Sequence, residues 1–123
     1  MVGHPMKHLR ALMMENGVVT AREVHGMRDG SRVAVAGLVI CRQRPGTAKG
    51  FVFLTLEDET GWVNIVVTPS RFERQAGVIT GSPLLLVRGV LQVEERVVNV
   101  RGATFAGLEA GAGEQHARGR DFH

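Results

Sequence analysis

The sequence predicts a mainly β fold, a small closed barrel of five strands in Greek-key order. A short helix is expected between the third and fourth strands, and a short helical segment before the first. Two observations carry this prediction. Residues 50–69 alternate apolar and other side chains with the period of two that strands show, and turns rich in glycine and proline separate five strand-like stretches along the chain.

A helical lead-in is expected over residues 1–30. Pro5 suits the first turn of a helix and Gly17 ends it. The apolar side chains between them fall along one helical face; they are Met6, Leu9 and Met13. Thr20 and Glu23 have the spacing of a capping box, so a second short helical turn should begin there.

The first strand is expected at residues 32–44, with Val33 and Val35 facing the core. Gly37 in its middle favours a β-bulge or a sharp bend, which would let one strand pair in two sheets. The donor-rich segment 42–50 should follow as an exposed loop, because its proline and two glycines exclude regular structure.

Residues 50–69 predict a hairpin whose two faces carry different kinds of side chain. Aliphatic side chains alternate on the core side: Val52, Leu54, Leu56, Val63, Ile65 and Val67. Aromatic and polar side chains alternate with them on the outer side, among them Phe51, Phe53, Thr55, Trp62 and Asn64. Between the strands, Asp58 can bond its own backbone and Gly61 tolerates positive φ, as a short turn requires.

The second half of the chain predicts a short helix and a last pair of strands. The helix should take one or two turns over residues 69–75, with Phe72 packing inward and Gly77 ending it, and should cap one end of the sheet. The two strands are expected at 83–94 and 96–105, each interrupted by a glycine.

This order of elements describes a barrel of the oligonucleotide/oligosaccharide-binding (OB) type over residues 31–105. Residues 106–123 contain much glycine and alanine and few core-forming side chains, so a flexible tail is expected there.

Composition limits the function classes. The 15 Lys and Arg exceed the 12 Asp and Glu for a net charge of +3, which permits an anionic partner without demanding one. The lone Cys41 forms no disulfide within the chain and is expected to be a buried small hydrophobe. No apolar run approaches the roughly 18 residues of a membrane span, so a cytoplasmic protein is expected.

An enzyme is not predicted. The sequence has no glycine-rich phosphate loop, no nucleophile elbow and no Cys/His pair with catalytic spacing. The acids at 57–59 point in different directions and the turn itself explains Asp58, so neither a metal nor another cofactor is expected.

Binding of single-stranded nucleic acid has a better physical basis. In such barrels, bases stack on aromatic side chains of the second and third strands while cations follow the phosphates. Candidates for the bases are Phe53 first, Phe51 second, then Trp62, Thr55 and Asn64, and candidates for the phosphates are Arg42, Arg44 and Lys49. The alternative is a protein-interaction barrel, in which Phe53 and Trp62 pack against another domain or a partner without touching DNA.

The run VAGLVICRQRPGTAKGFVFLTLEDETGWVNIVVTPSRFER, with the preceding GHPMKHLR and the terminal RDFH, closely resembles the C-terminal region of bacterial error-prone DNA polymerase, the damage-inducible homologue of the polymerase III alpha subunit. More distantly, FLTLED and GWVNIVV resemble the anticodon-binding barrel of aspartyl-type tRNA synthetases, which implies base contacts at Phe53 and Asn64.

The resemblance covers residues 3–123 and implies an OB-fold domain acting in translesion synthesis and DNA repair. It also implies single-stranded template DNA as ligand, and other polymerase domains, an inactive Y-family-like accessory protein and the sliding clamp as partners. The family's catalytic palm aspartates and its phosphoesterase-like domain have no counterpart in these 123 residues. The chain is therefore expected to be a fragment or the product of a truncated reading frame, and no clamp-binding peptide is evident in it.

Overall fold

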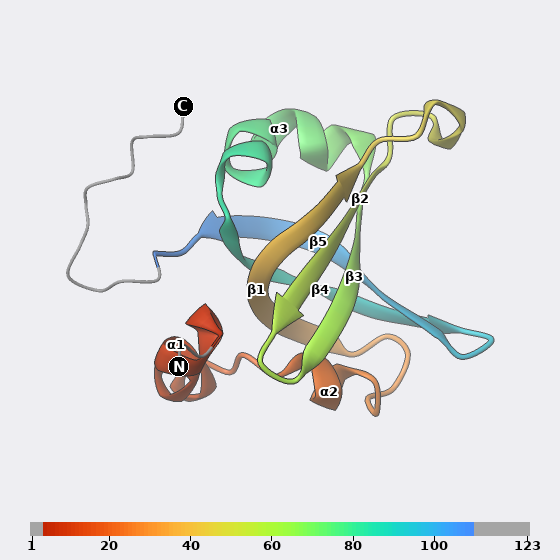
Figure 1. Ribbon diagram of the computed structural model, residues 1–123. Coiled ribbons are helices and arrows are strands. Elements are labelled where there is room, and N and C mark those ends of the chain that lie inside the picture. Colours follow the sequence, from red (N-terminus) through yellow and green to blue (C-terminus); the bar gives the residue numbers. More distant parts are fainter. Residues whose placement is uncertain (1–3, 110–123) are drawn as a thin grey trace.

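The five predicted strands are present in the computed structural model, which describes residues 4–109. Their bounds are β1 Arg32–Gln43, β2 Val52–Asp58, β3 Gly61–Val67, β4 Leu84–Glu94 and β5 Val97–Gly107. They close into a barrel in the order β1-β2-β3-β5-β4, in which β4 returns to pair with β1 (Figure 1). The predicted five-stranded OB barrel is confirmed.

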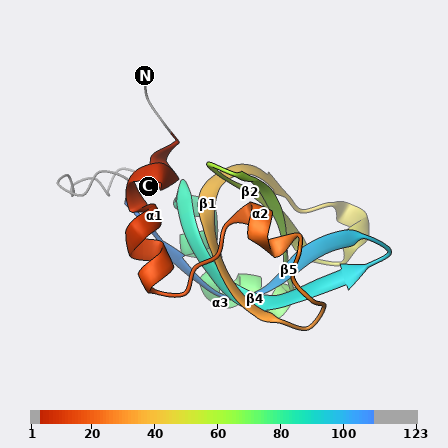
Figure 2. The same ribbon diagram turned by 90° about the horizontal axis from the view of Figure 1, so that it is seen from below.

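In the described part of the chain, three helices cover the ends and one side of the barrel, and a 3-10 turn lies in the loop between β1 and β2. They are α1 Pro5–Glu15, α2 Ala21–Val24, the 3-10 turn η1 Gly46–Ala48 and α3 Pro69–Gly81. In Figure 1, α3 lies over one end of the barrel and α2 over the other, and Figure 2 shows α1 beside β1 and β4. No helix within residues 4–109 has the length and apolar content to cross a membrane.

Strand β1 belongs to both sides of the barrel, as its bend suggested. It pairs with β4 through residues 32–38 and with β2 through 38–43. The bulge expected at Gly37 lies instead between Val39 and Cys41. Gly37 has another role, because a Cβ there would come within 2.7 Å of the Glu57 carbonyl oxygen, so the glycine permits the close approach of β2.

Two apolar clusters hold the fold together. The barrel interior contains the predicted inward residues, namely Val33, Val35, Val52, Leu54, Leu56, Val63, Ile65 and Val67. A second cluster fills the space between α1 and the outer face of β1 and β4, and it contains Met6, Met13, Val18, Ala34, Ala36 and Leu84. Burial on both faces of β1 was not predicted. Cys41, expected to be buried, is only half-buried, and it pairs with the half-buried Thr55 of β2.

Helix α3 is longer than predicted. It continues past Gly77 to Gly81 and buries Ile79 completely in the barrel core. A kink at Gln75, whose φ is −124°, divides it. The Gln75 side chain accepts from Phe105 N (3.0 Å) and donates to Ala103 O (3.1 Å), so it ties the kink to β5. Burial of Ile79 outweighs the weak helix propensity of the glycine.

The loop between β1 and β2 is also more regular than expected. Strand β1 extends through Arg42 and Gln43, and η1 forms a 3-10 turn at Gly46–Ala48. Lys49 and Gly50 then take positive φ values of 54° and 89°, which redirect the chain into β2.

Packing joins both expected flanking segments to the barrel. Ala21 and Val24 of α2 are fully buried in the interior cluster. At the other end, β5 runs to Gly107, and Leu108 N donates to Leu84 O (3.0 Å). Residues 106–109 therefore continue the fold, and the rest of the expected tail, 110–123, lies outside the described residues.

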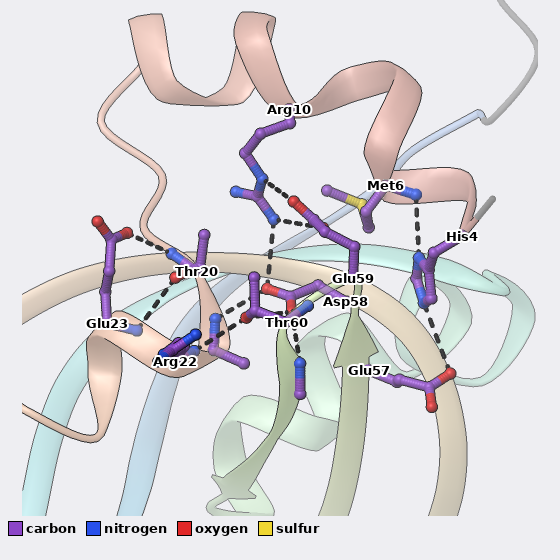
Figure 3. A network of polar contacts seen from close by, with 12 residues as sticks. His4, Met6, Arg10, Thr20, Arg22, Glu23, Glu57, Asp58, Glu59 and Thr60 are labelled. Atoms are coloured by element: carbon purple, nitrogen blue, oxygen red, sulfur yellow. Dashed lines mark hydrogen bonds and ion pairs between the residues drawn. The ribbon is translucent and has the colours of Figure 1, made fainter.

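A polar network centred on Asp58 joins α1 and α2 to the β2–β3 turn (Figure 3). Asp58 Oδ1 accepts from the turn itself, from Thr60 N, Thr60 Oγ1 and Gly61 N, as the sequence predicted. Its Oδ2 accepts from Ala21 N (2.8 Å) and from Arg10 Nη2 (3.2 Å). The carboxylate thus satisfies donors from three segments far apart in the sequence.

Arg10 holds the neighbouring acid as well. Its Nε and Nη2 donate to the two carboxylate oxygens of Glu59, at 2.7 and 3.1 Å. The predicted capping box is present beside it, with Thr20 Oγ1 accepting from Glu23 N and Glu23 Oε1 accepting from Thr20 N. Together these contacts fix the helical lead-in against the turn.

Acid should weaken the fold through Glu59. The hydrogen bonds from Arg10 lower the pKa of the Glu59 carboxyl from its ordinary value of 4.5. A carboxyl whose pKa is lower in the folded state stabilises the fold fully above pH 4.5. This contribution is lost as the pH falls through the lowered pKa of the folded state. Urea unfolding from pH 7 to pH 3 should therefore show a decline below about pH 4.5 that is smaller in Glu59→Gln. Equal declines in both proteins would contradict this role.

Candidate nucleic-acid interface

The outer face of β2 and β3 gathers the residues predicted to contact bases. Cross-strand pairing places Phe53 beside Val66, Thr55 beside Asn64 and Glu57 beside Trp62. These side chains are half-buried or exposed, whereas the alternate positions Val52, Leu54, Leu56, Val63, Ile65 and Val67 are buried. The alternation in the sequence therefore predicted correctly which side chains of β2 and β3 face outward. Phe51, just before β2, is also half-buried.

Trp62 is the most exposed aromatic side chain of this face, with 62% of its surface accessible. Its indole Nε1 donates to Glu57 Oε2 (3.2 Å), and its backbone carbonyl lies 3.1 Å from His25 Nε2. The edge of the indole is thus tied to β2 while most of the ring remains open to solvent. Such a ring can offer its face to a base.

Thr55 and Asn64 form the polar centre of the face. Thr55 Oγ1 donates to Asn64 Oδ1 (3.3 Å), which orients the amide. The contact uses an acceptor of Asn64 and leaves its two amide N–H donors for another partner. Those donors can bond the acceptor atoms on a base edge.

The three predicted phosphate-binding cations lie near the β1–β2 loop, but two of them also support α3. Arg42 donates from Nε to Ile79 O (3.0 Å) and from Nη2 to Ser82 O (2.9 Å), so it caps the end of α3. The Arg44 guanidinium stacks over the Phe72 ring, 4.9 Å from its centroid. Stacking occupies the flat face of the guanidinium and leaves its N–H edges free to donate. Lys49 is exposed.

The sequence did not reveal that this face continues onto β5 and β4. Strand β3 pairs in parallel with β5, which places Asn99 beside Asn64 and Arg101 beside Val66. Strand β4 then adds Gln92 beside Asn99. The alternation of residues 96–105 shows only that Asn99 and Arg101 share a face. A parallel pairing of strands separated by a helix and another strand leaves no local signal.

The acids of the β2–β3 turn are bonded to or lie beside basic and backbone groups of the protein itself. Arg10 and backbone donors engage Asp58, and Arg10 engages both oxygens of Glu59. Glu57 lies 3.5 Å from His4 Nε2. Across the part of the chain that the structure describes, no three His, Cys, Asp or Glu side chains gather as metal ligands would.

Sequence comparison identifies relatives of the whole chain. It is 50% identical over 98% of its length to an error-prone DNA polymerase of Anaeromyxobacter dehalogenans, and 46% identical over 87% to one of Caulobacter vibrioides. The chain spans only 11% and 10% of those relatives. The predicted resemblance to error-prone polymerases is confirmed, and what the chain shares with them is an OB domain and not a catalytic region.

Structure comparison finds the same barrel in proteins of other kinds. Asparaginyl-tRNA synthetase from Pyrococcus horikoshii aligns with a TM-score of 0.60 and 28% identity, over 72% of this chain and 22% of the synthetase chain. The S. pombe Stn1-ten1 complex aligns with a TM-score of 0.53 at 20% identity, over 63% of this chain and 57% of that chain, which shows a shared fold. The family model of the tRNA anticodon type, described as an OB-fold nucleic acid binding domain, matches residues 17–103. The chain therefore belongs to the family of OB-fold nucleic acid binding domains.

Proposed function

We propose that this chain binds single-stranded nucleic acid across the outer face of β2 and β3, and that its main ligand is template DNA. The observation that carries the proposal is that this one face holds an exposed indole and a half-buried Phe53 beside the oriented Asn64 amide. Stacking on aromatic rings suits any base, so binding should tolerate changes of sequence.

Each group has a defined part in the proposed complex. Phe53 and Trp62 stack bases, with Phe51 as a further ring at the start of β2. Asn64, positioned by Thr55, donates to a base edge. Arg44, Lys49 and the unused donors of Arg42 lie along the phosphates, because the β1–β2 loop borders the face (Figure 1).

The relatives suggest the setting. They are error-prone DNA polymerases about ten times longer than this chain, so we infer that the domain holds template DNA for a polymerase acting in translesion synthesis and repair in the cytoplasm. Its partners would be the template strand and the other polymerase domains.

A second candidate is a protein-interaction barrel that docks onto the polymerase without touching DNA. Two observations favour it. Glu57 places a carboxylate on the face beside Trp62, where it repels phosphates, and Arg42 is already bonded to α3. In this case Phe53 and Trp62 would pack against a protein surface.

Salt dependence separates the two candidates. If about three loop cations reach phosphates, these contacts alone should make log K for a labelled single strand fall with log salt with a slope of about −2, since each contact contributes about −0.7. Arg44→Ala should make the slope shallower by about 0.7. Fluorescence anisotropy at several salt concentrations measures both values.

Arg28→Ala is the matched control, because Arg28 is exposed and lies outside the loop and the face. Its slope should equal that of the parent chain. No binding at low salt, or binding whose affinity does not change with salt, would contradict the nucleic-acid proposal and favour protein docking.

A further inference from the structure

A pocket opens beside the β2–β3 face, where β3 ends and α3 begins. Its volume is about 440 Å³, and its lining comes from three separate segments: Thr68, Ser70 and Arg71; Val90; and Arg101, Gly102 and Ala103. None of the residues predicted from the sequence to bind nucleic acid lines it. No acidic side chain lines it either.

The pocket is continuous with the stacking face. Phe53 pairs with Val66, Val66 with Arg101, and Arg101 with Val90, so the four residues form one row across β2, β3, β5 and β4. Paired residues of neighbouring strands point to the same side of a sheet. A strand of nucleic acid whose base lies on Phe53 can therefore reach the pocket by following this row.

The donors of the pocket suit an anion. Arg71 Nη1 donates to Ala103 O (2.9 Å), which fixes its guanidinium at the rim and leaves its other N–H groups unused by that bond. Arg101 is exposed, and the ion pairs found within residues 4–109 involve only His4 and Arg10, so no carboxylate neutralises Arg101. The hydroxyls of Thr68 and Ser70 add two further donors. Two guanidinium groups without a lining acid favour phosphate over any neutral ligand.

We propose that this pocket is a phosphate site for the bound strand, with Arg101 as its principal ligand and Arg71 as the second. The inference rests on the proposed function and extends it: the strand crosses from the β1–β2 loop over Phe53 to β5, instead of ending at β3. The interface then has cations at both of its borders and stacking rings between them.

The experiment compares two oligonucleotides that have the same bases but different backbones. An oligothymidine with ordinary phosphodiesters and one with neutral methylphosphonates are titrated, by fluorescence anisotropy, with the parent chain and with three variants: Arg101→Ala, Arg88→Ala and Phe53→Ala. Arg88 is the matched control because it is an exposed arginine of β4 that pairs with Ala34 and Thr104, outside the pocket lining. Thermal unfolding of each variant checks that the barrel is intact.

Arg101→Ala should weaken binding of the phosphodiester strand by about five-fold at 0.1 M salt and make the salt slope shallower by about 0.7, as the loss of one phosphate contact requires. It should leave binding of the methylphosphonate strand unchanged, and Arg88→Ala should change neither. If Arg101→Ala behaves as Arg88→Ala while Phe53→Ala still weakens binding, the pocket proposal is overturned and the stacking face stands. If the parent binds neither strand, both proposals fall.

Discussion

Replacing Asp58 with alanine is expected to reduce the free energy of unfolding by about 3–5 kcal/mol, because it removes one member of a buried ion pair. The Asp58 side chain is only 2% exposed and accepts from Ala21 N, Thr60 N, Gly61 N and Arg10. Without the carboxylate, backbone donors that are shielded from water lose their acceptor. The turn, α2 and α1 would loosen together.

Urea denaturation at pH 7 measures this effect, with Glu73→Ala as control. Glu73 is an exposed acid of α3, so its removal should change the free energy of unfolding by no more than about 0.5 kcal/mol. Asp58→Asn keeps one acceptor oxygen and should fall between the two. A loss below about 1 kcal/mol in Asp58→Ala would mean that the network around Arg10 does not stabilise the fold.

Apart from the five-stranded barrel itself, the features predicted from the sequence were those set by neighbouring residues. The period of two in residues 50–69 predicted the hairpin and which of its side chains face outward, because side chains alternate across a strand whatever surrounds it. The Asp58 turn and the Thr20 capping box were predicted for the same reason, since their bonds span two or three residues.

Long-range features were missed because no local pattern encodes them. The bond from Arg10 to Asp58 spans 48 residues, and the parallel pairing of β3 with β5 joins strands that are not consecutive. That pairing brings Asn99 and Arg101 to the candidate site. Arg42, predicted as a phosphate ligand from its place in a donor-rich segment, also bonds to the end of α3, and no local pattern indicated that long-range contact.

Phe53→Ala is expected to weaken binding of single-stranded DNA by about five-fold to a hundred-fold, because stacking one base on an aromatic ring is worth roughly 1–3 kcal/mol. The fold should remain intact, since Phe53 lies on the outer face of β2 while its neighbours Val52 and Leu54 are in the core. Thermal unfolding of the variant, beside that of the parent chain, checks this condition.

Trp62 offers a direct readout of the same event, because it is the chain's single tryptophan and lies on the same face. A base stacked on the indole should quench its fluorescence, so titration with an unlabelled strand should lower the signal. The strand concentration at half-saturation should be about five-fold or more higher in Phe53→Ala than in the parent. Leu12→Ala removes an exposed apolar side chain from α1 instead and should titrate as the parent does. If Phe53→Ala also titrates as the parent, Phe53 does not stack a base. If the strand leaves the Trp62 fluorescence of the parent itself unchanged, the aromatic face does not stack bases, and its exposed rings serve contact with another protein surface.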